Sequence, residues 1–332
     1  MHPTGPSILL TDPMHPDALA RLRECYTVDE ALDLTKTALI ERVGSYSVII
    51  GRTSTKLDKE VLEAATSLKA IGVHATGWDH IDIEEATSRG VRVLGFPTDT
   101  EAFADDTLRG SFIPVAEHVL MGMLMLAKRA LESTASIKEG RWDKYRLMGT
   151  ELYGKTLGIV GLGRIGSLIA TRARAFGMDV IAAHPRLTKD EAMARGAWLV
   201  PFEELLGRSD FITVHVPRRH DTIGLIGRGE FTRMKDGVVI VNTSRAGIVD
   251  EEALLAALDK NVRGAVIDVF GHPPEGVNWE LAKHPRVVAT PHIAGVTEES
   301  LERVSSHIVE SVLRFLDTGE VRGLINPEVL SV

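Results

Sequence analysis

Short runs of valine, isoleucine and leucine alternate along the chain with longer segments whose apolar residues recur at helical spacing. The runs are nearly continuous in apolar residues, which is typical of strands buried on both faces of a parallel sheet. They form two series, at 7–10, 47–50, 69–73 and 91–94, and at 156–160, 179–182, 211–216, 238–241, 264–269 and 287–289. Strands separated by helix-length segments indicate βαβ units. The pattern predicts an α/β protein with two doubly wound parallel-sheet domains.

The gap between the two series predicts how the chain is divided. Pro114 opens a strongly helical stretch over 119–131, and proline suits the first turn of a helix because its missing N–H is no loss there. A second amphipathic stretch, 300–316, follows the last strand and can return to the first domain. We therefore expect a discontinuous substrate domain, 1–114 and 300–332, and a Rossmann dinucleotide-binding domain, 115–299.

Composition narrows the class of protein. Of 332 residues, 44% are hydrophobic and 25% charged, which is ordinary for a soluble globular chain and excludes a disordered one. The net charge of −8 disfavours a nucleic-acid partner. One cysteine, Cys25, excludes an intrachain disulfide and a cysteine-rich metal site, and we expect no metal. With no secretory signal and no apolar stretch near the ~20 residues of a membrane span, we expect a cytoplasmic protein without membrane contact.

A glycine-rich motif follows the first strand of the second series. Gly161, Gly163 and Gly166 form the pattern G-x-G-x-x-G, directly after the strand 156–160 and at the start of a helix. The first glycine permits a tight turn, the second a close approach to a pyrophosphate, and the third close packing of helix on strand. The N–H groups that begin the helix, around Arg164 and Ile165, suit phosphate. The alternative is a glycine-rich turn without a ligand.

The end of the next strand departs from the usual pattern. An acidic residue normally stands there and binds the ribose hydroxyls of the adenosine half. Here His184 takes that place, Arg186 follows it, and Asp179 lies at the opposite end of the strand. A carboxylate would repel a ribose 2′-phosphate, whereas a guanidinium can pair with one. The expected cofactor is NADP or NAD; the alternative is that Arg186 is merely exposed and NAD is used.

Three polar segments follow later strands of the second series, at 241–250, 267–270 and 289–295. With them the chain resembles the D-isomer-specific 2-hydroxyacid dehydrogenases, in particular the 3-phosphoglycerate dehydrogenase-like branch. The resemblance runs from about Val43 to Ile325 and is densest over 148–246. It implies a flavodoxin-like substrate domain, a Rossmann domain, and interconversion of a 2-oxo acid and the D-2-hydroxy acid by hydride transfer from NAD(P)H.

The resemblance also implies residue roles. Arg245 matches the arginine that holds the substrate carboxylate, because a guanidinium offers a planar fork of donors. His292 matches the acid/base, because an imidazole titrates near neutral pH. Asp268 matches a residue at the nicotinamide end of the cofactor. Further cofactor contacts are implied for Val216, Thr243, Ser244 and Gly295. Without the resemblance, the ordinary alternatives are a surface ion pair for Arg245 and a satisfied buried histidine for His292.

Two departures from the family pattern concern the substrate side. The family glutamate that pairs with the histidine would stand at Pro273; either Glu275 reaches the same place and raises the pKa of His292, or the pair is incomplete. The loop expected to cradle the substrate carboxylate with backbone N–H groups reads His74, Ala75, Thr76, Gly77, with fewer glycines than the family has. The acidic segment 98–112 is either a substrate lid or a solvated excursion.

Two classes of function remain open. The leading hypothesis is an NAD(P)-dependent D-2-hydroxyacid dehydrogenase acting on a small-molecule 2-oxo or 2-hydroxy acid. The alternative is a catalytically weak dinucleotide-binding sensor or interaction protein of the same fold, which the displaced glutamate motivates. The apolar helix after Pro114 resembles the family's dimerisation element, so we expect a homodimer.

Overall fold

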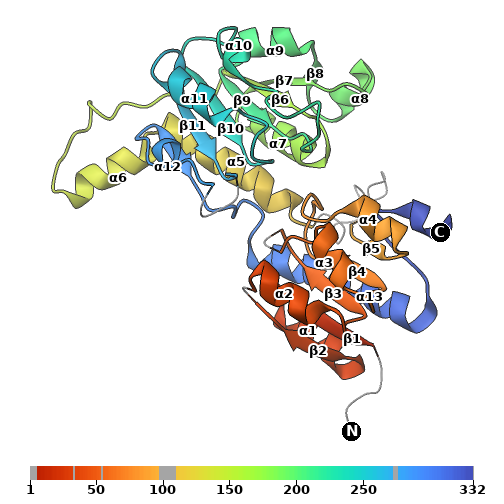
Figure 1. Ribbon diagram of the computed structural model, residues 1–332. Helices are drawn as coiled ribbons and strands as arrows, with labels where there is room; N and C mark the ends of the chain where they lie inside the picture. Colours follow the sequence, from red (N-terminus) through yellow and green to blue (C-terminus); the bar gives the residue numbers. More distant parts are fainter. Residues whose placement is uncertain (1–5, 33, 54, 97–109, 272–275, 332) are drawn as a thin grey trace. The chain divides into compact units, whose positions relative to one another are not determined.

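The chain divides into two compact units, each built around one parallel β-sheet (Figure 1). The structure is a computed structural model that describes residues 6–32, 34–53, 55–96, 110–271 and 276–331. Unit 1 comprises Met1–Ser111 and Val296–Val332, and unit 2 comprises Phe112–Gly295. The assignment of unit 1 to the substrate remains a prediction.

Unit 1 contains a five-stranded sheet in the order β2-β1-β3-β4-β5, with every neighbouring pair parallel. This is the order of flavodoxin-like domains. Its strands are β1 (Ser7–Leu10), β2 (Thr27–Glu30), β3 (Val48–Gly51), β4 (Ala70–Val73) and β5 (Arg92–Leu94). Its helices are α1 (Pro16–Cys25), α2 (Lys36–Val43), α3 (Lys59–Ala64), α4 (Ile83–Ser88) and α13 (Glu298–Thr318), followed by the 3₁₀ helix η3 (Pro327–Ser331).

Helices cover both faces of the unit 1 sheet. One apolar core joins the sheet to α1 and α13, and includes Leu22 and Ile308. The other joins the opposite face to α2, α3 and α4, and includes Val43 and Leu62. Helix α13 lies some 200 residues beyond the sheet it covers, so the two ends of the chain complete one domain. Helix α13 contains the amphipathic stretch 300–316 and packs on the sheet formed by the N-terminal part of the chain.

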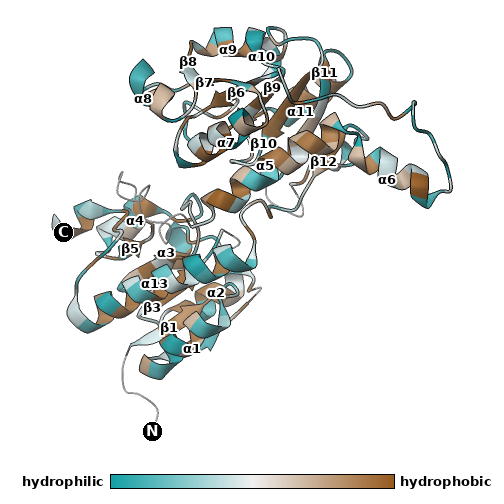
Figure 2. Cartoon of the chain, turned by 180° about the vertical axis from the view of Figure 1, so that it is seen from behind, coloured by the Kyte–Doolittle hydropathy of each residue, from teal (hydrophilic) through white to brown (hydrophobic). Residues whose placement is uncertain are grey.

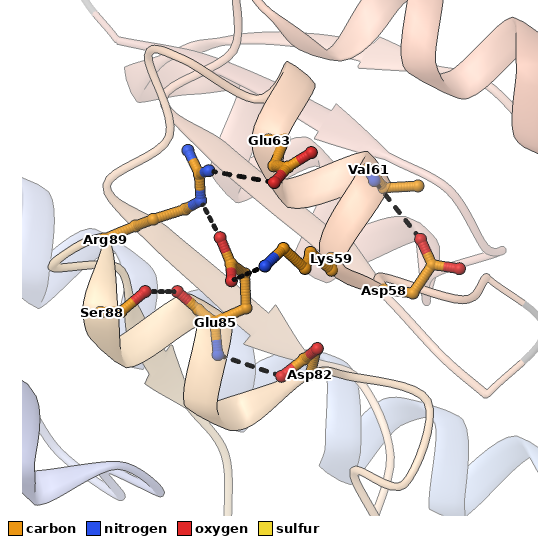
Figure 3. Close-up of polar contacts among 8 residues, drawn as sticks. All are labelled: Asp58, Lys59, Val61, Glu63, Asp82, Glu85, Ser88 and Arg89. Atoms are coloured by element: carbon orange, nitrogen blue, oxygen red, sulfur yellow. Dashed lines mark hydrogen bonds and ion pairs between the residues drawn. The ribbon is translucent and has the colours of Figure 1, made fainter.

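Helices α3 and α4 begin at aspartate caps and are linked by charged side chains (Figure 3). Asp58 and Asp82 each accept a hydrogen bond from a backbone N–H in the first turn, at 3.4 and 3.0 Å. The Glu85 carboxylate accepts from the Arg89 guanidinium at 2.6 Å and lies 3.7 Å from Lys59 Nζ on α3. A cap stabilises by about 1 kcal/mol and an exposed ion pair by less. The caps therefore define where these helices start.

The segment after α13 covers an edge of the unit 1 sheet. The Ile325 N–H donates to the Val93 carbonyl of β5 at 2.8 Å. The Asn326 side chain is 0% exposed; it accepts from the Val93 N–H at 2.8 Å and donates to the Val91 carbonyl at 2.9 Å. These bonds pair backbone groups that an edge strand would otherwise leave unpaired.

Unit 2 contains a seven-stranded sheet in the order β12-β11-β10-β9-β6-β7-β8, again with parallel pairs. The order reverses at β6 and β9, as in Rossmann domains, and ligands bind at such a switch point. The strands are β6 (Thr156–Val160), β7 (Asp179–Ala183), β8 (Trp198–Leu199), β9 (Phe211–Val214), β10 (Val238–Asn242), β11 (Val262–Ile267) and β12 (Val287–Ala289). The fold class that the sequence predicts is confirmed.

Two helical layers cover the unit 2 sheet. One core packs α5 (Phe112–Ala127), α7 (Arg164–Ala175) and α8 (Lys189–Ala194) on the sheet. The other packs α9 (Phe202–Arg208), α10 (Arg228–Phe231), α11 (Glu251–Leu258) and α12 (Trp279–Ala282) on the opposite face. Helix α6 (Ala130–Lys138) follows α5 and contacts it.

Helix α5 approaches the unit 2 sheet at a glycine and is apolar along most of its length (Figure 2). A Cβ at Gly122 would lie 2.6 Å from Val266 Cγ1 of β11, so only glycine fits at this crossing. The prediction of one helix through residue 131 is wrong, because Arg129, at φ 52°, adopts the left-handed conformation and separates α5 from α6.

Among the described residues, no helix is both long and apolar enough to cross a bilayer.

The sequence missed two edge strands. β2 reads Thr-Val-Asp-Glu and is at most half-buried, and β8 has two residues. Neither forms an apolar run, because a strand at a sheet edge needs no second apolar face. Most of the predicted long loop, at 97–109, lies outside the described residues.

Candidate active site

The predicted site residues of unit 2 follow the carboxyl ends of six neighbouring strands. In sheet order they are His292 after β12, Asp268 after β11, Thr243, Ser244 and Arg245 after β10, Val216 after β9, Gly161 after β6, and His184 after β7. Because all these strands are parallel, their carboxyl ends share one edge of the sheet, which is where such sheets bind ligands. The topology thus places residues from 161 to 292 on a single edge.

In the turn after β6, close packing requires glycine at two of the three glycine positions. Gly161 has φ +98°, and a Cβ there would lie 2.4 Å from the His215 carbonyl oxygen. A Cβ at Gly166 would lie 2.5 Å from the Gly161 carbonyl oxygen. At Gly163, by contrast, no described atom lies within 4 Å of the Cβ position, and no side chain caps α7, which begins at Arg164. The open position and the uncapped N–H groups leave room for a phosphate.

A basic corner lies at the end of β7. His184 Nδ1 accepts a hydrogen bond from the Arg186 N–H at 3.2 Å. Arg195, which follows α8, donates from Nη1 to the carbonyl of Leu162 in the glycine turn at 2.9 Å. Burial and the positive charges of Arg195 and Arg186 lower the pKa of His184, and Glu191 opposes the shift. The imidazole is therefore neutral at physiological pH, and the two guanidinium groups supply the positive charge.

The turn that carries Arg245 is held by Asn242, the last residue of β10. Asn242 Oδ1 accepts from the Ser244 N–H at 3.1 Å and from its hydroxyl at 2.8 Å, and Nδ2 donates to the Arg245 carbonyl at 3.0 Å. Arg245 is half-buried and donates from Nη1 to the Ser244 carbonyl at 2.8 Å. The buried Thr243 hydroxyl has no hydrogen-bond partner among the described residues. An unpaired buried hydroxyl costs about 1–3 kcal/mol, so this position suits a polar ligand group.

The loop that carries His292 wraps around the Asp268 carboxylate, which is 1% exposed. Oδ1 accepts from the Thr290 hydroxyl at 2.5 Å and the Ile293 N–H at 2.9 Å, and Oδ2 accepts from the Ala294 N–H at 3.0 Å. The Asp268 carbonyl accepts from the His292 N–H at 2.9 Å. His292 itself is exposed and has φ +57°, a conformation that costs a histidine energy. Asp268 thus holds a strained histidine at the sheet edge.

In unit 1, the predicted substrate loop follows β4. His74 is 0% exposed, its Nε2 lies 2.8 Å from Ser305 Oγ of α13, and its N–H donates to the Gly51 carbonyl at 2.8 Å, so this residue is part of the fold rather than a ligand contact. Ala75 is buried, whereas Thr76 and Gly77 are half-buried. Backbone N–H groups of 75–77 therefore remain the candidate contacts for a carboxylate.

Charged residues surround His74 at the ends of β1 and β3. The buried Asp12 carboxylate accepts from the Arg52 N–H at 2.8 Å. Burial, together with the nearby Arg52 guanidinium, lowers the pKa of His74 to about 3. Burial likewise lowers the pKa of His215, in unit 2, to about 3. Both imidazoles are neutral at physiological pH and do not exchange protons there.

Glu275 and Pro273 lie outside the described residues, so the pairing of Glu275 with His292 stays a prediction. Within the described part of the chain, no group of three or more histidine, cysteine, aspartate or glutamate side chains is arranged to hold a metal ion.

The sequence pattern assigned no role to four side chains that support the site: Arg195, Asn242, His118 and Thr290. Asn242 closes an otherwise apolar run, and that polar residue at a strand end was a usable signal. Arg195 reaches the glycine turn from 33 residues away. His118 and Thr290 meet across 172 residues, at 3.1 Å. No spacing rule connects such distant residues.

Two of the three glycines of the turn, Gly161 and Gly163, make a matched test of dinucleotide binding. Gly163→Ala should leave the free energy of unfolding within about 0.5 kcal/mol of wild type, because its Cβ meets open space. It should raise the Kd for NADH or NADPH about tenfold, because it fills the space for the pyrophosphate. Gly161→Ala should instead destabilise the fold. Fluorescence titration and urea unfolding measure both; an unchanged Kd for Gly163→Ala would place the dinucleotide elsewhere.

Comparisons with known proteins identify the family. The family model described as the NAD binding domain of D-isomer specific 2-hydroxyacid dehydrogenase matches residues 120–294, nearly all of unit 2. D-3-phosphoglycerate dehydrogenase of Archaeoglobus fulgidus is 40% identical over 321 residues, covering 96% of this chain and 59% of that protein. The chain therefore spans less than two thirds of that relative.

Solved structures are similar over the whole chain. A glyoxylate reductase from Paecilomyes thermophila is 29% identical with a TM-score of 0.85, covering 98% of this chain and 99% of that one. An acyclic imino acid reductase in complex with NADPH and D-Arg is 26% identical with a TM-score of 0.80, covering 96% and 99%. On the match of its NAD binding domain and the identity of its relatives, the chain belongs to the D-isomer specific 2-hydroxyacid dehydrogenase family.

Proposed function

We propose that this protein is an NAD(P)-dependent oxidoreductase that interconverts a 2-oxo acid and the D-2-hydroxy acid. One observation carries the proposal. Arg245, Asp268 and His292 follow the carboxyl ends of β10, β11 and β12, which are neighbours in the sheet that also carries the glycine turn. A carboxylate-binding cation, a proton donor and a dinucleotide cradle thus belong to one sheet edge. These are the parts that reduction of a 2-oxo acid requires.

Arg245 is assigned to the substrate carboxylate. A guanidinium presents a planar fork of donors that matches the two oxygens of a carboxylate. The Asn242 bonds fix the backbone of the turn in which Arg245 lies, and the bond from Arg245 Nη1 to the Ser244 carbonyl restrains the guanidinium itself. A fixed cation costs little entropy when the substrate arrives.

His292 is assigned to the proton. Reduction of a ketone adds a proton to the carbonyl oxygen, and oxidation of the alcohol removes it, so one group must serve as acid and as base. His292 is exposed at the sheet edge and is held by the Asp268 loop. Glu275, where it pairs with this imidazole, stabilises the charged form and raises the pKa of His292.

Unit 2 fits a nicotinamide dinucleotide, which supplies hydride chemistry when bound. Gly163 leaves its Cβ position open, and α7 presents uncapped N–H groups to the pyrophosphate. The unpaired hydroxyl of Thr243 and the residues Ser244, Val216 and Gly295 lie farther along the same edge or in the loop after β12. These residues bind and orient the dinucleotide; they carry no redox chemistry of their own.

The substrate class is a small 2-oxo acid, and relatives suggest two members of it. The relative from Archaeoglobus fulgidus is named for D-3-phosphoglycerate, and the structural neighbour from Paecilomyes thermophila for glyoxylate. The loop 74–77 begins with the buried His74, and the resemblance leads us to expect more glycines in this loop than the chain has. We therefore propose the class and leave the choice between a phosphorylated and a small acid to assay.

A panel of 2-oxo acids with NADH and NADPH tests the function. Wild type should turn over at least one member. His292→Asn should lower kcat about 10²- to 10⁴-fold with dinucleotide Kd unchanged. Arg245→Lys, which keeps the charge but loses the fork, should raise KM for the 2-oxo acid about tenfold or more. Tight dinucleotide binding without turnover across the panel would contradict the proposal and favour the sensor.

The basic corner leads us to propose that the cofactor site accepts the 2′-phosphate of NADP(H). His184 stands where a carboxylate would exclude that phosphate, Arg186 and Arg195 are near enough to this imidazole to lower its pKa, and a structural neighbour is in complex with NADPH. Arg186→Ala should raise the Kd for NADPH about tenfold and leave the Kd for NADH within about twofold. Arg208→Ala, which removes an exposed arginine on α9, is the control. Equal Kd values for both cofactors in Arg186→Ala and wild type would contradict this.

We also propose a homodimer through the segment around α6. Large apolar side chains stand exposed there: Leu131, Ile137, Trp142, Tyr145, Met148 and Tyr153. Trp142 is 83% exposed. A group of large apolar side chains exposed to water is unfavourable and is typical of an interface with another protein. Trp142→Ser should shift the sedimentation equilibrium toward monomer at micromolar concentration. Trp198→Ser, at an exposed tryptophan on the edge strand β8, should not; equal behaviour of the two variants would locate the interface elsewhere.

A further inference from the structure

His118 brings a polar side chain into an otherwise apolar part of unit 2. It lies on α5, whose neighbouring buried residues are aliphatic, and is itself 9% exposed. Its Nε2 lies 3.1 Å from Thr290 Oγ1 and 3.9 Å from Asp268 Oδ1. Burying an imidazole where leucine would pack costs energy unless its polar atoms are used. The contacts show where they are used.

The direction of the hydrogen bonds follows from the groups involved. Asp268 Oδ1 is an acceptor, so the Thr290 hydroxyl donates its single hydrogen to it, at 2.5 Å. Thr290 Oγ1 then has only lone pairs to offer, so His118 Nε2–H must be the donor. The hydrogen bonds therefore run from His118 to Thr290 and from Thr290 to Asp268. Burial lowers the pKa of His118, and the Asp268 charge opposes the shift.

This series of hydrogen bonds ends on the loop that carries His292, the proposed acid/base. The Asp268 carboxylate that Thr290 fixes is the one that accepts from Ile293 and Ala294, directly after His292. Those bonds offset the cost of the left-handed conformation at His292, φ +57°. If the carboxylate turned, the loop would lose both bonds and relax toward an unstrained conformation. The imidazole would then point in more than one direction.

We propose that His118 is a positioning residue, which through Thr290 and Asp268 keeps the His292 loop in one conformation. The inference rests on the proposed function only in taking His292 as the acid/base. His118 does not exchange a proton with substrate in this scheme. It supplies a donor, so a side chain with an N–H at the same reach can replace it, and an apolar one of similar size cannot.

Four variants distinguish the loss of a hydrogen-bond donor from a change in side-chain volume. His118→Gln keeps an N–H, and His118→Leu removes it. Thr290→Ser keeps the hydroxyl, and Thr290→Val removes it with the same shape. Met121→Leu, one turn along α5 at a partly exposed residue, is the control for the helix. Each variant is assayed for kcat, for KM of the 2-oxo acid and for dinucleotide Kd.

The donor-free variants should lower kcat about tenfold or more, with dinucleotide Kd unchanged, because a misplaced proton donor slows the chemical step. His118→Gln and Thr290→Ser should restore most of kcat. The double variant that combines His118→Leu with Thr290→Val should be no slower than Thr290→Val alone, because both substitutions break the same series of hydrogen bonds. Equal losses in His118→Gln and His118→Leu would mean packing alone and would overturn the proposal.

A readout independent of turnover keeps this test separate from the proposed function. The imidazole ¹⁵N signals of His292, assigned by difference against His292→Asn, should form one sharp set in wild type and in His118→Gln. In His118→Leu they should broaden or shift. Unchanged signals in His118→Leu would overturn the positioning role, whatever the activity. A wild-type protein without turnover, but with the expected signals, would refute the proposed function and leave the positioning role supported.

Discussion

The parallel hydrogen-bonded ladder of unit 2 is the constraint on which the candidate site depends. Six consecutive strands in the sheet, β12 through β7, end at the same edge, and each is followed by a polar residue or glycine. Strands in one sheet lie about 4.8 Å apart, so residues distant in sequence become neighbours at fixed spacing. A shift in any one pairing would displace one part of the site from the others. The apolar cores on both faces hold that register.

Within this frame, buried polar groups position the residues at the surface. Asn242 uses its amide to hold the turn of Arg245, and Asp268 uses its carboxylate to hold the loop of His292. Each is nearly fully buried and would cost several kcal/mol if left unpaired. Their bonds therefore resist rearrangement, because an alternative loop conformation would leave a buried amide or carboxylate without donors or acceptors.

The sequence predicted the features whose cause is local. Continuous Val/Ile runs predicted the central strands, and the helical spacing at 300–316 predicted α13 and its return. The need for glycine at 161 and 166 followed from the motif, and the structure explains it, because a Cβ at these positions would lie 2.4 and 2.5 Å from carbonyl oxygens. Features that depend on contacts between residues distant in sequence could not be predicted from the local pattern. The polar edge strand β2, the break at Arg129, and the meeting of His118 with Thr290 depend on neighbours that no window contains.

The histidines show how one residue type is divided between structure and chemistry. Burial lowers the pKa of His74 and of His215 to about 3 and lowers that of His118, so these three imidazoles enter the fold as neutral donors or acceptors. His292 is placed differently: it stands in solvent, in a strained conformation, at the end of an edge strand. A proton can reach it without crossing the core. Desolvation thus removes the buried histidines from acid–base chemistry at neutral pH, while the same burial lets His118 act as a fixed donor. In our proposal, His292 at the sheet edge exchanges the proton, and the buried His118 holds the loop that carries it.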